Sequence, residues 1–186
     1  MRVLAVAGSL RPDSYNRKLL LAAGELFPDD VEFDVFEGLK AVPPYDEDDD
    51  VEPAPAAVAR LRAAIAGADA ILFATPEYNS SIPGQLKNAI DWASRPLATN
   101  VLRNKPVAVI GASTGAFGAV WAQADLRKVL GATGARVVDA ELPVGHAQGR
   151  FDEASGALND PNLVDELREV VWSLVDETVP ARAAAA

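Results

Sequence analysis

Three short segments of the chain crowd hydrogen-bonding side chains into predicted loops. They are GSLRPDSYN (residues 8–16), TPEYNSSIPG (75–84) and ASTGAFG (112–118). Each follows an apolar run that is typical of a buried strand. Because ligands of parallel α/β folds bind outside the carboxyl ends of the strands, we expect these loops to form a binding site.

The first loop has the composition of an anion site. Gly8 permits a tight turn, and four side chains after it can donate hydrogen bonds: Ser9, Arg11, Ser14 and Asn16. Arg11 also adds a positive charge on a fixed fork of donors. A helix is expected to begin near residue 15, and the free N–H groups at a helix start favour a phosphate. Taken alone, Ser14 is equally consistent with a simple helix cap.

The type of phosphate ligand follows from the motifs that are missing. The first loop lacks G-x-G-x-x-G, the fingerprint of dinucleotide-binding folds, and no Gly-Lys-Ser/Thr follows it as in nucleoside-triphosphate loops. A phosphate that binds without either motif indicates a mononucleotide.

The elements that would position these loops alternate along the chain. Strands are expected over residues 2–7, 31–37, 69–75, 106–112 and 136–142, and helices over about 15–27, 55–67, from 83, about 118–131 and 160–178. This alternation predicts an α/β fold with a parallel sheet and helices on both faces. Right-handed crossovers favour a flavodoxin-like three-layer sandwich with five strands in the order 2-1-3-4-5. We expect a single domain over residues 1–179 and a disordered tail over 180–186.

Composition excludes several classes of function. The chain has 186 residues, no cysteine, one histidine (His146) and a formal net charge of −10. The lack of cysteine rules out disulfides and thiolate chemistry, and a single histidine makes a metal site unexpected. The negative charge disfavours nucleic-acid and anionic-membrane partners. No apolar run approaches the ~20 residues of a membrane span, and without an export signal we expect a cytoplasmic protein.

Taken together, the three loops resemble those of a known family. The segments GSLRPDSYNRKLL (8–20), ATPEYNSSIPGQLKNAIDWASRP (74–96) and GASTGAFGAVWAQADLRKVL (111–130) are similar to those of the NADPH-dependent FMN reductases. These are flavodoxin-like enzymes that include quinone, chromate and azo reductases. The resemblance covers roughly residues 1–146. Where the family often has two glycines in a row, this chain has Gly118 followed by Ala119.

The resemblance implies an FMN-dependent NAD(P)H oxidoreductase, with FMN as cofactor and NADPH or NADH as co-substrate. Hydride would pass from the nicotinamide to the flavin N5 and then to a quinone, free flavin, azo compound or metal oxyanion. By this resemblance the FMN phosphate is held by Ser9, Arg11, Ser14 and Asn16. The ribityl chain and the ring edge contact Pro76, Glu77, Tyr78 and Asn79, and Ser113 and Gly115 flank the ring. No catalytic side chain is expected, because the cofactor carries the chemistry.

The resemblance also implies a homodimer or homotetramer that acts on a small-molecule acceptor. Candidate contacts are the helix from residue 83, with Trp92, and the helix over 118–131, with Phe117 and Trp121. Packing of the two tryptophans inside their own subunit is an equal alternative.

Two other functions fit parts of the sequence. GASTG (111–115) matches the G-x-S-x-G elbow of α/β-hydrolases, and Asp125 or Asp139 and then His146 follow Ser113 in the order of a catalytic triad. No oxyanion loop precedes this segment, and the hydrolase hypothesis leaves the first two loops unexplained. The second alternative is a flavodoxin-type electron carrier, but flavodoxins typically have no arginine in the phosphate loop, where this chain has Arg11.

Overall fold

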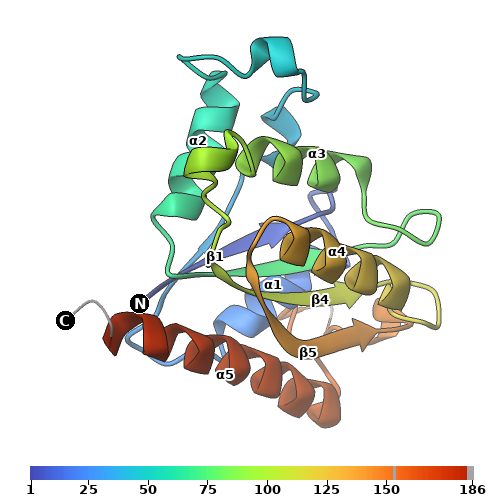
Figure 1. Ribbon diagram of the computed structural model, residues 1–186. Helices are drawn as coiled ribbons and strands as arrows, with labels where there is room; N and C mark the ends of the chain where they lie inside the picture. Colours follow the sequence, from blue (N-terminus) through green and yellow to red (C-terminus); the bar gives the residue numbers. More distant parts are fainter. Residues whose placement is uncertain (153, 184–186) are drawn as a thin grey trace.

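The computed structural model describes residues 1–152 and 154–183. Its centre is a parallel sheet of five strands in the order β2-β1-β3-β4-β5, as the sequence predicted (Figure 1). The strands are β1 (Arg2–Ala7), β2 (Glu32–Val35), β3 (Ala70–Thr75), β4 (Pro106–Ala112) and β5 (Arg136–Val144).

Helices cover both faces of the sheet, which gives the predicted three-layer sandwich (Figure 1). They are α1 (Tyr15–Gly24), α2 (Ala56–Ala66), α3 (Gly84–Ala93), α4 (Val120–Ala132) and α5 (Pro161–Ala183). Helices α2, α3 and α4 lie on one face, and α1 and α5 lie on the other. None of the helices in residues 1–152 and 154–183 is long and apolar enough to cross a membrane.

The sheet is buried on both faces because its central strands β3 and β4 are apolar at every position except Thr75. All residues of β3 and β4 are buried, whereas β2 lies at the edge and is only partly covered. Alternate residues of β1 enter the two cores: Leu4 and Val6 join the core under α2, α3 and α4, and Val3 and Ala5 join the core under α1 and α5. This packing explains why the central strands are continuous hydrophobic runs.

Some boundaries differ from the prediction. Helix α1 ends at Gly24, although it was expected to reach residue 27. After Gly24 the chain forms a tighter turn, in which the N–H groups of Leu26 and Phe27 donate to the carbonyls three residues earlier. Pro28 then disfavours a helical conformation at Phe27, which is buried. At the other end of the chain, α5 continues to Ala183, beyond residue 179 where we expected the domain to end. Residues 184–186 of the expected tail lie outside the described residues.

The loop before α4 has an unusual backbone. Gly118 and Ala119 are both left-handed, with φ of 57° and 62°. A Cβ on Gly118 would lie 2.3 Å from the carbonyl carbon of Pro143, so only glycine fits there. Ala119, where the family often has a second glycine, adopts the left-handed conformation with its methyl group buried in the core. The loop is therefore held tightly against the end of β5.

This contrast gives a prediction for two adjacent positions. Gly118→Ala should lower the free energy of unfolding by about 2–4 kcal/mol, because it adds left-handed strain and a clash with backbone. Ala119→Gly should change it by less than about 1 kcal/mol, since relief of the strain offsets the lost methyl group. Urea unfolding followed by circular dichroism measures both, and similar values for the two variants would contradict this account of the loop.

Candidate active site

The three polar loops meet at one edge of the sheet. Strand β3 pairs with β1 on one side and with β4 on the other, so the carboxyl ends of these strands are neighbours. A pocket of about 140 Å³ lies between the loops that follow them. Its lining residues are Ser9, Arg11, Ser14, Tyr15, Asn16, Pro76, Glu77, Tyr78, Ala112, Ser113 and Thr114.

Most of the predicted cofactor residues therefore line one pocket. Two of them, Asn79 and Gly115, are not among its lining residues. Three lining residues were not predicted: Tyr15, Ala112 and Thr114. The position of Tyr15 was a signal in the sequence, because it stands between two predicted contacts at the start of a helix. In the structure its ring stacks on that of Phe151, with ring centroids 5.9 Å apart.

The first loop ends in a capped helix. The Ser14 Oγ accepts a hydrogen bond from the Asn16 N–H at 3.2 Å, which is the expected N-cap contact of α1. Before it, the Arg11 N–H donates to the Ser9 Oγ at 3.4 Å. The exposed Arg11 guanidinium makes no ion pair with any residue that the structure describes, whereas nearby Arg17 and Lys18 are paired with Glu37 and Asp13. Arg11 is thus available to an anionic ligand.

Asn16 joins the first loop to the third. Its buried side chain donates from Nδ2 to the Ala112 carbonyl at 2.9 Å, and its Oδ1 accepts from the Ala112 N–H at 2.9 Å. The side-chain amide therefore pairs with the backbone at the end of β4 as a neighbouring strand would, and it fixes the start of α1 beside β4. This pair of bonds accounts for an asparagine at this position.

The second loop is a tight reverse turn. Tyr78 and Ser81 exchange two backbone hydrogen bonds, at 3.0 and 3.1 Å. Asn79 and Ser80 between them have φ of 53° and 59°, the positive values of a two-residue type I′ hairpin turn. The turn holds Tyr78 at the mouth of the pocket, where half of its side chain is exposed.

Two carboxylates hold this turn against α4. The Glu77 Oε2 accepts hydrogen bonds from the N–H groups of Trp121 and Ala122, both at 3.1 Å. The Ser81 Oγ donates to the Asp125 carboxylate at 2.5 Å. A negative charge is favourable at a helix start, where N–H groups lack partners within the helix. One oxygen of the Glu77 carboxylate is therefore bonded to the start of α4, and this contact fixes the second loop relative to the third.

The aromatic residues proposed as subunit contacts differ in exposure. Phe117 and Trp121 are 65% and 47% exposed and pack edge to face, with ring centroids 5.0 Å apart. Trp92 is fully buried and donates from Nε1 to the Pro43 carbonyl at 2.9 Å. Of the two alternatives for Trp92, packing inside its own subunit is therefore the correct one, because this side chain of α3 lies in the core.

The geometry does not assemble a serine hydrolase. The Ser113 Oγ accepts from the Gly115 N–H at 3.1 Å. The candidate acids are engaged elsewhere, since Asp125 accepts from Ser81 and Asp139 from Arg127. His146 is an exposed residue of the loop after β5, and its side chain makes no hydrogen bond with the described residues. No Ser–His–Asp relay is therefore available.

The side chain with a lowered pKa and the acidic side chains add no further candidate for catalysis at this edge of the sheet. Burial lowers the pKa of Lys105, partly offset by the charge of Asp69, but Lys105 directly precedes β4 at the opposite edge. Within residues 1–152 and 154–183, no cluster of three or more histidine or acidic side chains could hold a metal ion. The pocket thus offers hydrogen-bond donors and one unpaired cation rather than acid–base or metal chemistry.

Comparison with known proteins matches this geometry to one family. The family model of the NADPH-dependent FMN reductases matches residues 1–149. An NAD(P)H-dependent FMN reductase of Pseudomonas aeruginosa is 42% identical over 172 residues, which cover 92% of this chain and 89% of the relative. A 2-hydroxy-1,4-benzoquinone reductase of a Burkholderia species is 41% identical over 179 residues, covering 95% and 93%.

A solved structure supports the same conclusion. FerB of Paracoccus denitrificans, a flavoenzyme NAD(P)H:(acceptor) oxidoreductase, superposes with a TM-score of 0.84 at 37% identity and covers 95% of this chain and 96% of its own. Because relatives this similar extend over nearly the whole length, the chain belongs to the NADPH-dependent FMN reductases, flavin-dependent oxidoreductases that take their electrons from NAD(P)H.

Proposed function

We propose that the pocket between the three loops holds FMN and that the enzyme reduces small-molecule acceptors, quinones first among them. The observation that carries this proposal is the Arg11 guanidinium in the loop before α1, which forms no ion pair with the described residues and lies beside two loops that open onto the same pocket. The quinone and FMN reductases among its relatives supply the class of acceptor. With NAD(P)H as the reductant, we also propose that it acts in the cytoplasm.

The first loop suits the phosphate of FMN. Arg11 offers charged donors, and the Ser9 hydroxyl lies beside it. The Ser14 Oγ accepts from the Asn16 N–H, so its own proton is free to be donated to a phosphate oxygen. The N-terminal dipole of α1 adds to the attraction. Asn16 supports this site through its bonds to Ala112.

The other two loops suit the ring and its sugar chain. Pro76, Tyr78 and Ser113 line the pocket, and Tyr78 presents an apolar face at its mouth. Because the Glu77 carboxylate is bound to α4, Glu77 would contact the cofactor through its backbone. Two further predicted residues would support the site without lining the pocket. Asn79 shapes the turn that carries Tyr78 through its left-handed backbone, and Gly115 donates a hydrogen bond to Ser113.

The residues of the chain would position the reaction rather than take part in it. When bound, FMN supplies the redox chemistry, accepting hydride from the nicotinamide and delivering electrons to the acceptor. We retain the prediction that no side chain needs to transfer a proton, because the redox chemistry belongs to the cofactor. Nicotinamide and acceptor would use the exposed side of the pocket in turn, beside Tyr78.

The phosphate assignment predicts the effect of removing Arg11. Arg11→Ala should weaken FMN binding by about tenfold or more, since a hydrogen bond to a charged group contributes roughly 1.5–3 kcal/mol. Arg11→Lys should recover part of the loss, because it keeps the charge but loses the forked donors. Quenching of FMN fluorescence on titration with apo-protein measures the affinity, and NADPH-dependent reduction of benzoquinone measures the activity.

Arg168→Ala is the matched control, because it removes an exposed arginine from α5. An Arg11→Ala variant that binds FMN as tightly as this control would overturn the phosphate assignment. A purified protein whose bound flavin is not bleached by NADPH or NADH would instead support the electron carrier.

The role given to Glu77 predicts a loss of stability even without flavin. Glu77→Ala should lower the free energy of unfolding of the apo-protein by about 1–2 kcal/mol, as for the loss of a helix cap. Glu77→Gln should lose less, because its carbonyl oxygen can still accept from Trp121 and Ala122. Hydrogen exchange at these two amides is the direct measurement, with Glu166→Ala on α5 as the control. If apo-protein stability were unchanged while FMN affinity fell, Glu77 would contact the cofactor directly.

We propose a homodimer or homotetramer in which Phe117 and Trp121 are buried between subunits. The pair is supported as a contact by its exposure and by its position directly beside the turn that carries Tyr78. The double variant Phe117→Ser/Trp121→Ser should sediment as a monomer, because interfaces depend on a few buried aromatic residues. Trp172→Ser, which changes a similarly exposed tryptophan on α5, should keep the oligomer. Sedimentation velocity distinguishes the two results, and a double variant that stays assembled would contradict the proposed contact.

A further inference from the structure

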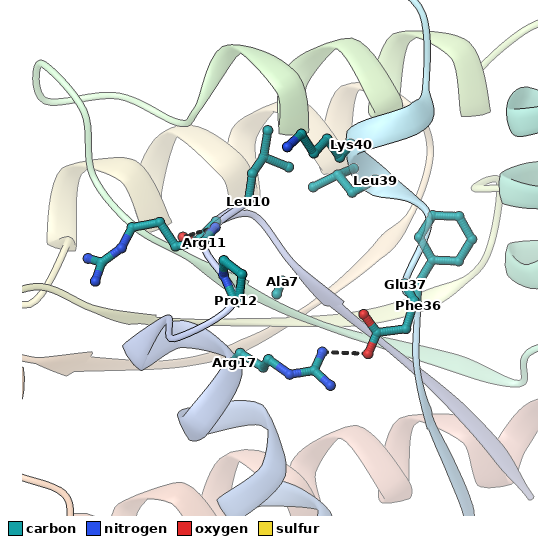
Figure 2. Close-up of a pocket in the computed structure, with 10 residues that line it drawn as sticks. Ala7, Leu10, Arg11, Pro12, Arg17, Phe36, Glu37, Leu39 and Lys40 are labelled. Carbon is teal, nitrogen blue, oxygen red and sulfur yellow. Dashed lines mark hydrogen bonds and ion pairs between the residues drawn. The ribbon is translucent and has the colours of Figure 1, made fainter.

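A second pocket lies on the other side of the first loop. It has a volume of about 340 Å³, within the usual size range of small-molecule sites. Figure 2 shows it between the loop that carries Leu10, Arg11 and Pro12 and the segment after β2 that carries Phe36, Glu37 and Lys40. Of its lining residues, only Ser9 and Arg11 also line the pocket proposed for FMN.

The pocket combines an apolar wall with charged groups. Leu10, Pro12 and Phe36 form the apolar part, and Leu10 is 43% exposed, which is high for a leucine. Arg17 and Glu37 form an ion pair at 2.6 Å, drawn as a dashed line in Figure 2. Lys40 is exposed and makes no ion pair with any residue in the described part of the chain. An apolar surface beside a free cation suits a ligand with a planar base and a phosphate.

The walls of this pocket are fixed in advance. Lys40 lies in η1 (Leu39–Ala41), a short 3₁₀ turn. The Gln85 side chain on α3 donates from Nε2 to the Leu39 and Val42 carbonyls, both at 2.8 Å, so it holds this turn from both sides. Such a site needs little rearrangement to bind a ligand.

The second pocket adjoins the proposed FMN pocket. Ser9 and Arg11 line both, so the first loop is a shared wall. Figure 2 shows the Arg11 guanidinium pointing away from Phe36 and Leu39, whereas Lys40 remains on their side of the loop. A ligand with one end over the flavin could therefore pass across the loop and place its other end in the second pocket.

We propose that the second pocket receives the adenosine end of the nicotinamide dinucleotide and that Lys40 makes the enzyme prefer NADPH to NADH. Leu10 and Phe36 would contact the adenine, and the Lys40 ammonium would bind the 2′-phosphate. This inference rests on the proposed function, because it requires the nicotinamide to reach the flavin in the first pocket.

The charge of Glu37 also affects the preference between NADPH and NADH. Like charges repel, so a carboxylate beside the 2′-phosphate would weaken the binding of NADPH. Glu37 lies two residues after β2, and its charge is compensated by Arg17. Because the carboxylate is paired, it repels a phosphate less than a free one would, and the net charge of the pocket stays positive.

The experiment compares steady-state kinetics of the FMN-loaded enzyme with NADPH and with NADH, using benzoquinone as acceptor. Lys40→Gln should raise the KM for NADPH about tenfold and the KM for NADH less than twofold, with kcat unchanged. Glu37→Gln should lower the KM for NADPH, because it removes the negative charge beside Arg17. Lys128→Gln, an equal change of charge on the exposed face of α4, should alter neither KM.

A binding measurement separates the phosphate from the rest of the ligand. Adenosine 2′,5′-bisphosphate should compete with NADPH more strongly than adenosine 5′-monophosphate, and Lys40→Gln should remove this difference. The inference is overturned if Lys40→Gln leaves the ratio of the two KM values unchanged or raises both equally. Failure of the proposed function would look different, because the wild-type enzyme would then retain no FMN or oxidise neither nicotinamide.

Discussion

The arrangement of the site depends on the two hydrogen bonds between the Asn16 side chain and the backbone of Ala112. They join the start of α1 to the end of β4, across a sheet in which β3 lies between the two strands that lead to these points. The buried amide donates to the C=O and accepts from the N–H of the same residue, so neither loop can shift without leaving polar groups unpaired. Glu77 then fixes the second loop to α4 in the same way, through two backbone N–H groups.

These hydrogen bonds change how the polar groups of the loops are interpreted. We predicted Asn16 and Glu77 as cofactor contacts from their positions, and in the structure both side chains form hydrogen bonds with the backbone of the protein itself. The groups left free are those of Arg11, Ser9 and the Ser14 hydroxyl, which together suit a phosphate. An enzyme whose cofactor carries the chemistry gains most from such fixed loops, because position and electrostatics are what the protein supplies.

The charge distribution supports the same view of how ligands bind. The chain carries a formal net charge of −10. Two adjacent pockets are nevertheless lined by Arg11 and Lys40, neither of which forms an ion pair within residues 1–152 and 154–183. Anionic ligands are therefore attracted to one edge of an otherwise acidic molecule. That edge holds a flavin phosphate in the proposed function and a nucleotide phosphate in the further inference.

The sequence by itself determined the strand order, the helical layers, the three loops and the family, because hydrophobic periodicity and short loop motifs are local properties. It could not show that Trp92 is buried, that Glu77 binds α4, or that Asn16 binds Ala112, since each depends on residues brought together from distant parts of the chain. The second pocket was also beyond prediction, because it forms between the first loop and the segment after β2, whose residues show no common motif. Only the tertiary structure decides which polar side chains remain free for a ligand, because hydrogen-bond partners depend on packing across the sheet rather than on spacing along the chain.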